Sequence, residues 1–474
     1  MAPAAGRAWG RLQARETAVN EKPRSSFEAT TAYVGDLLDS LNRRGRSLLR
    51  RKPAAVADSV PDLAALGEML LSRRGEASGV VLAQGLLAAF AAAGPEGRLG
   101  FLRTLADRFG PDPGKVDAAV AALDATEDRT EALERLHVAA EPRRLELFRR
   151  LNLAPRGTEA LVRMREDLLG RLRDHPELRR VDADFAHLFG SWFNRGFLEL
   201  RHIDWGTPAN ILEKIIRYEA VHQIRNWDDL RSRLEPTDRR CYGFFHPQLV
   251  DEPLIFVEVA LTREIPDRVG GILDLDRRPI PAEEATTAVF YSISNTQKGL
   301  AGVTFGNFLI KQVVEELKAE LPNMKTFVTL SPVPGFAAWL ERERQAEGAL
   351  DPTQRALLDL LDDPAWREDP EKVEAVRGVL LPLAARYFLE AKTDAGKPID
   401  PVARFHLGNG ARLERLNYLG DVSENGLRQA HGLMVNYLYA LDEIEANHEA
   451  FAEKGVVAAA PEVKKLLPPP RPAS

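Results

Sequence analysis

The segment from residue 288 to 339 most constrains the fold, because it reads as a strand, a glycine-rich turn, a helix and a second strand. Ala288–Ser294 is apolar and β-branched without Gly or Pro, which is typical of a buried strand. Apolar residues then recur at helical spacing over Leu309–Leu317, with charged residues on the opposite face. Thr326–Leu330 is predicted to be the second strand, since the prolines and glycine that follow prevent its continuation.

Glycines at 299, 302 and 306 fill the turn between the first strand and the helix. Glycine lets the backbone approach a ligand closely, and the free N–H groups at a helix start suit a phosphate. The spacing matches neither G-x-x-x-x-G-K-[ST] nor G-x-G-x-x-G with a later acidic residue. From Thr296 the pattern is x-x-G-x-A, which resembles the pyrophosphate loop of the GNAT acetyltransferase fold. The Arg or Gln that usually opens this loop is displaced here by one position, to Gln297. A tight turn without a ligand is the alternative that the loop alone leaves open.

Length, charge and cysteine content limit the class of protein. A chain of 474 residues exceeds one ordinary core, so two domains are expected. A net charge of −6 gives no basic signature for nucleic acid, and no apolar run reaches the length of a membrane span. The single cysteine, Cys241, excludes an internal disulfide and fits a reducing compartment, so we predict a cytoplasmic protein. Residues 1–25 are predicted to be a disordered tail; their basic composition makes a mitochondrial targeting segment the alternative.

Residues 26–190 are predicted to form an all-α domain. Apolar residues recur there at helical spacing, prolines separate the segments, and β-branched residues are sparse. The region shows no catalytic constellation. Helical bundles of this kind often hold subunits together, so we expect an oligomerisation domain.

Residues 191–474 are predicted to form an α/β domain with a mixed sheet. Thr207-Pro208 has the pattern of a helix start, with the threonine as cap. Strands are predicted at Arg239–Phe245 and Leu254–Leu261, in addition to the two that flank the glycine turn. The region Phe405–Asn417 is predicted to be a further strand.

Three motifs after the glycine turn resemble malonyl-CoA decarboxylase. They are S-P-V-P-G-F from Ser331, F-H-L-G-N-G-A from Phe405 and G-L-M-V-N-Y from Gly432. The resemblance runs almost continuously over 191–439 and includes W-F-N-R-G-F-L, E-A-V-H and H-P-Q-L-V-D-E-P-L. It implies a GNAT-like catalytic domain that binds malonyl-CoA, a homo-oligomer (dimer or tetramer), and a role in fatty acid or malonate metabolism.

Decarboxylation of a malonyl thioester leaves two electrons on the α-carbon, delocalised onto the thioester oxygen as an enolate. The protein must stabilise that oxygen and protonate the carbon, a task that suits histidine. The thioester is itself the electron sink, so no cofactor is expected. The resemblance places the family's catalytic serine and histidine on Ser331 and His406, with Asn409 and Tyr439 as possible supporting residues.

The resemblance also places the coenzyme A contacts on the glycine turn. The expected set comprises Gly299, Ala301, Gly302, Val303, Thr304, Phe305, Gly306 and Asn307, together with Ser331 and His406. Some family members carry an acidic residue where Thr304 stands, so no carboxylate role is assigned in this loop.

Two other functions stay open at this point. The GNAT fold mostly transfers acyl groups from coenzyme A to amines, and fold alone does not decide function. A non-catalytic acyl-CoA sensor is the third possibility. No H-E-x-x-H or C-x-x-C motif accompanies the histidines, so no metal site is predicted.

Overall fold

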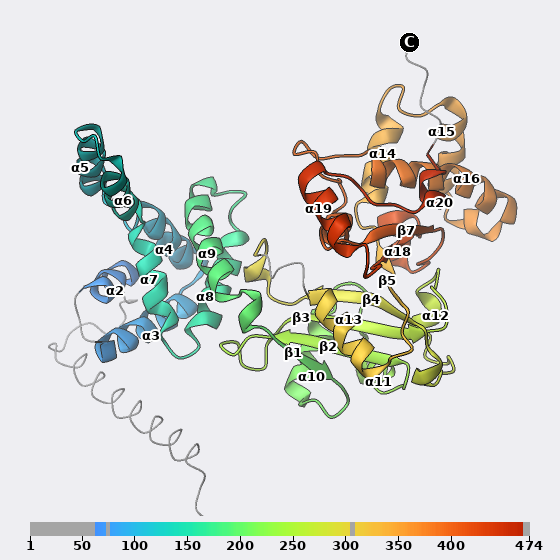
Figure 1. Cartoon of the computed structure of the whole chain (residues 1–474), viewed down its shortest axis with the longest axis horizontal. Coiled ribbons are helices and arrows are strands. Elements are labelled where there is room, and N and C mark those ends of the chain that lie inside the picture. Colours follow the sequence, from blue (N-terminus) through green and yellow to red (C-terminus); the bar gives the residue numbers. More distant parts are fainter. Residues whose placement is uncertain (1–61, 73–75, 304–308, 468–474) are drawn as a thin grey trace, which may run out of the picture. The chain divides into compact units, whose positions relative to one another are not determined.

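The computed structural model describes residues 62–72, 76–303 and 309–467 (Figure 1). The chain divides into two compact units, residues 1–93 and 94–474. In the first unit α2 (Leu63–Leu71) begins at Asp62, whose side chain accepts a hydrogen bond from the Ala64 N–H, and α3 (Glu76–Ala92) follows. The predicted tail and the predicted helices before residue 62 lie outside the described residues.

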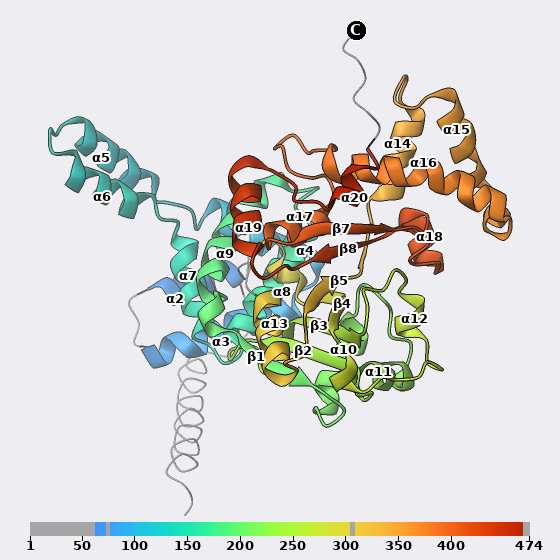
Figure 2. The same cartoon turned by 45° about the vertical axis from the view of Figure 1, so that its right-hand side comes forward.

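The second unit begins with helices, as the apolar periodicity predicts. Phenylalanines form part of their core, with the Phe148 and Phe185 rings stacked at 4.1 Å between centroids. The helices α5 and α6 lie side by side and extend away from their neighbours (Figure 2). The helices of this part are α4 (Pro95–Asp107), α5 (Pro113–Asp124), α6 (Arg129–Ala140), α7 (Arg143–Asn152), α8 (Gly157–Leu169) and α9 (Arg179–Trp192).

A mixed sheet, eight-stranded in the described residues, follows in the unit together with further helices; its order is β1-β2-β3-β4-β5-β8-β6, with β7 paired to β8. Neighbouring strands are antiparallel except β4 and β5, which are parallel. The mixed sheet predicted from the sequence is therefore confirmed. The strands are β1 (Glu199–Ile203), β2 (Arg239–Phe245), β3 (Pro253–Thr262), β4 (Thr287–Asn295), β5 (Thr326–Thr329), β6 (Ser331–Pro332), β7 (Arg412–Asn417) and β8 (Met434–Leu438).

The strand–turn–helix–strand unit predicted from the sequence is present. The strand β4 leads through the short 3₁₀ turn η4 (Lys298–Leu300) toward α13 (Leu309–Glu320), and β5 returns parallel to β4. Parallel strands end at the same edge of a sheet. The glycine turn after β4 and Ser331 after β5 therefore lie at the same edge.

One predicted strand is wrong in part. The region Phe405–Asn417 contains the helix α17 (Pro401–Gly408) and only then β7 (Arg412–Asn417). The helix forms because Asp400 caps its N-terminus and Pro401 occupies its first position, where proline is well accommodated. His406 consequently projects from a helix rather than from a strand.

The predicted capping role of Thr207 is also wrong. The helix α10 (Ala209–Tyr218) has Pro208 at its N-cap position and no side-chain cap. The Thr207 hydroxyl instead accepts from the Asp204 N–H at 3.0 Å, because a local turn competes for it. The remaining helices are α11 (Trp227–Leu234), α12 (Gly270–Leu273), α14 (Phe336–Gln345), α15 (Pro352–Leu358), α16 (Pro370–Leu389), α18 (Glu424–Ala430), α19 (Ile444–Lys454) and α20 (Pro461–Lys464).

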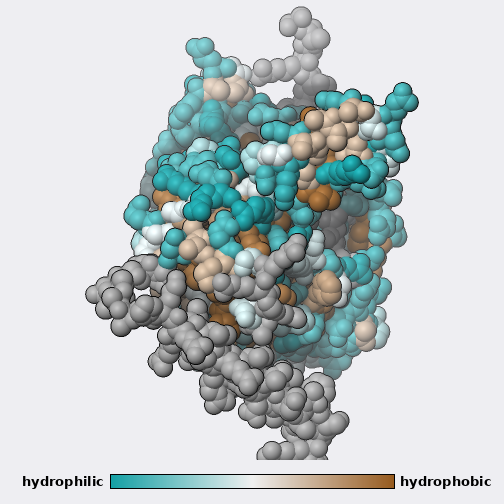
Figure 3. All heavy atoms as spheres, turned by 90° about the vertical axis from the view of Figure 1, so that its left-hand side faces the viewer, coloured by the Kyte–Doolittle hydropathy of each residue, from teal (hydrophilic) through white to brown (hydrophobic). Residues whose placement is uncertain are grey.

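The described surface is largely polar on the face in Figure 3, where hydrophilic colours predominate between smaller apolar areas. Within the described ranges, no helix combines the length and the apolar character needed to cross a membrane.

Candidate active site

A serine and a histidine that lie 75 residues apart in sequence meet at the end of β5. Strand side chains alternate between faces, so Thr329 and Ser331 point the same way. The Ser331 hydroxyl donates to the Thr329 hydroxyl at 2.9 Å and lies 3.3 Å from Nε2 of His406. Both members of the pair are buried, with 6% of Ser331 and 3% of His406 exposed.

His406 is held by two aromatic residues of the segment that contains β8. Its Nδ1 atom lies 2.8 Å from the Tyr439 hydroxyl oxygen, and its ring stacks on Tyr437 at 4.6 Å between centroids. Because Ser331 donates to Thr329, the consistent arrangement has Tyr439 donating to Nδ1 and the Nε2–H donating to Ser331.

Burial governs the charge of this histidine. Desolvation lowers the pKa of His406 from 6.5 to about 3, so the imidazole is neutral at pH 7. Burial also raises the pKa of Tyr439, which keeps its phenol protonated as a donor. The site therefore contains a neutral chain of hydrogen bonds from Tyr439 through His406 and Ser331 to Thr329.

Side chains connect β5 to β8 where backbone pairing between these two strands is sparse. Only Val328 and Leu438 are in register between them. Thr329 makes the further connections: its hydroxyl accepts from the Tyr437 N–H at 3.2 Å, and its carbonyl accepts from the Asn436 amide at 2.8 Å. The Tyr439 N–H also donates to the Phe327 carbonyl at 2.8 Å, so the segment that carries both tyrosines is held against β5.

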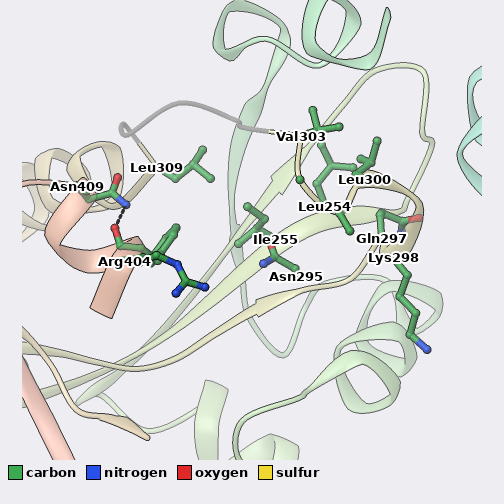
Figure 4. Close-up of a pocket in the computed structure, with 14 residues that line it drawn as sticks. Leu254, Ile255, Asn295, Gln297, Lys298, Leu300, Val303, Leu309, Arg404 and Asn409 are labelled. Atoms are coloured by element: carbon green, nitrogen blue, oxygen red, sulfur yellow. Dashed lines mark hydrogen bonds between the residues drawn. The ribbon is translucent and has the colours of Figure 1, made fainter. Parts of the chain in front are cut away.

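A cleft of about 540 Å³ lies between the glycine turn and α17 (Figure 4). Lys298 and Arg404 are the charged residues among its described lining, and no carboxylate occurs there. This charge suits an anionic ligand. The described lining residues are Leu254, Ile255, Asn295, Gln297, Lys298, Leu300, Ala301, Gly302, Val303, Leu309, Arg404, Phe405, Gly408 and Asn409.

The structure divides most of the predicted residues that it describes between two places. Ala301, Gly302, Val303 and Asn409 line the cleft. Ser331, His406 and Tyr439 lie buried together, and α17 joins the two groups because Phe405 and Gly408, on either side of the histidine, also line the cleft. Predicted contacts at Thr304, Phe305, Gly306 and Asn307 lie outside the described residues.

The two described glycines of the turn serve different purposes. Gly302 has φ +75°, a conformation that favours glycine, and open space where a Cβ would stand. Gly299 does not line the cleft: a Cβ there would lie 2.0 Å from the carbonyl oxygen of Val162 in α8. The close approach that Gly299 permits is therefore to a helix of the same chain.

The sequence reasoning missed Thr329, Tyr437 and Arg404. Thr329 precedes Ser331 by two residues, and this strand spacing was the available signal for it. Tyr437 precedes Tyr439 by the same spacing. Arg404 could have been found only by recognising that α17 is a helix with one face on a cleft.

The cysteine thiol and the metal-ligating side chains of the described residues suggest no further reactive site. Cys241 is fully buried, and burial raises the pKa of its thiol well above the ordinary value, as expected for an inert thiol. Within the described part of the chain, no cluster of three or more His, Cys, Asp or Glu residues is placed to hold a metal ion.

The helical region, the mixed sheet and the glycine turn that follows β4 define an α/β domain preceded by an all-α segment. Residues 196–473 match the malonyl-CoA decarboxylase C-terminal domain, and residues 109–193 match the N-terminal domain of the same family. The chain therefore belongs to the malonyl-CoA decarboxylase family and is an enzyme of the carboxy-lyase class.

Individual relatives agree with this assignment. Mitochondrial malonyl-CoA decarboxylase from Anser anser anser is 37% identical over 387 residues, which cover 75% of this chain and 76% of the relative. The crystal structure of malonyl-CoA decarboxylase from Rhodopseudomonas palustris is similar with a TM-score of 0.83 and 64% identity, over 86% of this chain and 100% of that chain. That of the Agrobacterium vitis protein has a TM-score of 0.82 and 59% identity over the same shares.

Proposed function

We propose that this enzyme converts malonyl-CoA to acetyl-CoA and carbon dioxide without a cofactor. The observation that carries the proposal is the buried hydrogen-bonded chain from Tyr439 through His406 to Ser331, set beside a cleft lined by cations. The family membership and the names of the relatives support the same substrate.

Coenzyme A would occupy the cleft between the glycine turn and α17. Its phosphates are anionic, and the described lining offers Lys298, Arg404 and the backbone at Gly302. Among the described residues, the Gly302 N–H donates to no backbone carbonyl, so it is available to a phosphate oxygen. The thioester end would then extend along α17 toward His406.

The reaction begins when the bond between the α-carbon and the carboxylate breaks. The electron pair moves onto the α-carbon and is delocalised onto the thioester oxygen, while the carboxylate leaves as carbon dioxide. A site that removes water from around the carboxylate favours its loss as a neutral molecule. Ser331 donates to Thr329 and accepts from the Nε2–H of His406, so it orients the histidine; its O–H would bind the carboxylate only by turning away from Thr329.

His406 would supply the proton that converts the enolate to acetyl-CoA. A thioester enolate is a stronger base than the anion of imidazole, so neutral His406 is acidic enough to transfer its Nε2 proton to the α-carbon. Donation from Tyr439 to Nδ1 would stabilise the negative charge that develops on the ring. Uptake of one proton from solvent after product release restores the neutral imidazole and balances the reaction.

The deciding experiment incubates the purified full chain with malonyl-CoA alone. We expect acetyl-CoA and carbon dioxide in equal amounts, with no acceptor added and no free thiol released. A GNAT-type acyltransferase would release free coenzyme A only when an amine is present, and a non-catalytic sensor would bind malonyl-CoA without consuming it. Either of these results would overturn the proposal.

We further propose that the protein is a homo-oligomer held together by its helical region. The hairpin of α5 and α6 exposes Val120, Leu133 and Val138, and it buries few of its own residues. Light scattering on a chain that lacks the hairpin should report a smaller assembly than the full chain. An unchanged assembly would place the interface elsewhere.

A further inference from the structure

A buried arginine in the helical region reaches the glycine turn of the catalytic domain. Arg165, in the middle of α8, is 3% exposed. Its Nη1 donates to the Gly299 carbonyl oxygen at 2.9 Å, and its Nε donates to the Asp182 carboxylate at 2.8 Å. Asp182 lies in α9, so the guanidinium that extends from α8 is oriented by a carboxylate of the neighbouring helix.

The same helix contacts the turn a second time, through its backbone. A Cβ at position 299 would lie 2.0 Å from the Val162 carbonyl oxygen, which is too close for any residue except glycine. One contact is a charge-assisted hydrogen bond and the other is close packing that only glycine permits. Together they restrain the position of a single peptide unit.

That peptide unit is flanked in sequence by residues that line the cleft. Gly299 faces α8, and the next four residues, from Leu300 to Val303, line the cleft. Backbone N–H groups bind phosphate well only when the turn is already held in the binding conformation, because ordering it on binding costs conformational entropy. The backbone bonds within the described part of the turn are short-range, such as the one from the Ala301 N–H to the Lys298 carbonyl.

We propose that Arg165 is a positioning residue for coenzyme A: from α8 it holds the glycine turn in its binding conformation. The inference rests on the proposed function of the cleft and extends it. The helical region then contributes to substrate affinity in addition to any role in assembly, although Arg165 does not line the cleft.

A positioning role and ordinary packing between helix and turn predict different results. Loss of ordinary packing lowers the melting temperature and leaves the affinity of the folded fraction unchanged. Loss of a positioning contact raises both the Kd for coenzyme A and the KM for malonyl-CoA. The kcat changes little, because the histidine and serine are held by β5, β8 and α17.

The test compares Arg165→Met, Arg165→Lys and the control Arg163→Met in the full chain. Arg163 lies on the same helix with its side chain 69% exposed, and it pairs with Glu159. We expect Arg165→Met to raise the Kd for free coenzyme A, measured by calorimetry, and the KM by about tenfold, the order expected for loss of a hydrogen bond from a charged donor. Arg165→Lys should restore part of the affinity, and Arg163→Met should match the wild type.

A second variant tests the same turn without touching the arginine. Gly299→Ala should weaken coenzyme A binding although the residue lies outside the cleft, and its effect should not add to that of Arg165→Met, because both displace one peptide unit. If Arg165→Met does not fold, Gly299→Ala and Arg165→Lys decide the question. Folded variants that bind coenzyme A as the wild type does would overturn the inference. Failure of the wild type to bind coenzyme A would instead overturn the proposed function.

Discussion

The Nδ1 atom of His406 lies 2.8 Å from the Tyr439 hydroxyl oxygen, although the two residues are 33 positions apart, one in α17 and the other directly after β8. This bond leaves Nε2 directed toward Ser331. With Tyr439 as donor, this bond places the proton of the neutral histidine on Nε2, the atom that we propose as the proton donor.

The first prediction concerns the proton donor. His406→Ala should lower kcat by roughly two to four orders of magnitude, the usual contribution of general acid catalysis, while coenzyme A still binds. Turnover of malonyl-CoA and calorimetric affinity for coenzyme A are the measurements, with His202→Ala as an exposed-histidine control. A kcat within about threefold of the wild type would remove His406 from the mechanism.

The second prediction separates the two tyrosines beside the histidine. Tyr439→Phe removes the partner of Nδ1 and should lower kcat by roughly tenfold, the effect of losing one positioned hydrogen bond. Tyr437→Phe should change kcat little, because within the described residues the Tyr437 hydroxyl has no hydrogen-bond partner and the stacked ring is retained. Equal effects of the two substitutions would contradict the assigned hydrogen-bond chain.

The third prediction is that Ser331 acts without becoming acylated. Its hydroxyl is buried against Thr329, and the surrounding sequence S-P-V-P-G has no G-x-S-x-G elbow. Ser331→Ala should lower turnover strongly, and Ser331→Cys should keep a small part because a thiol is a weak donor. Rapid acid quench with malonyl-CoA followed by mass spectrometry should show unmodified wild-type protein. A malonyl or acetyl adduct on Ser331 that forms as fast as turnover would favour acyl transfer.

The fourth prediction concerns the open glycine of the turn. Gly302→Val should weaken coenzyme A binding, because the side chain projects beside the cleft and the positive φ disfavours a β-branched residue. Gly348→Val is the matched control: Gly348 has φ +72°, equally open space and no place in the cleft. Both variants should lose stability, but only the first should lose affinity. Equal affinities by calorimetry would place the phosphates elsewhere.

The fifth prediction follows from the buried neutral histidine. The pKa of His406 is lowered from 6.5 to about 3, so as the pH falls through this range the unfolded chain binds a proton that the folded chain does not. His406 therefore makes the free energy of unfolding decrease with falling pH, and His406→Gln should reduce that slope. Denaturant unfolding at several pH values measures it, with exposed His202→Gln as the control. Burial also lowers the pKa of His222, to about 4, so this histidine contributes to the same pH dependence in every variant.

The local order of elements around the glycine turn followed from sequence because each signal there is short-range. The β-branched run of β4, the period of α13 and the prolines after Ser331 each act within a few residues, and the observed elements agree. The strand predicted over Phe405–Asn417 was wrong in its first half because Asp400, the residue that caps α17, lies before the F-H-L-G-N-G-A motif.

Sequence alone determined the family, the mixed sheet and the candidates Ser331 and His406, because motifs and periodicity are properties of neighbouring residues. Only the tertiary structure decided that Tyr439 is the partner of His406 and that Gly299 faces Val162 rather than the cleft. It also brought Arg165 to the carbonyl of Gly299, 134 positions further along the chain. Such contacts depend on how separate elements pack, and no local pattern in the chain encodes the distance between them.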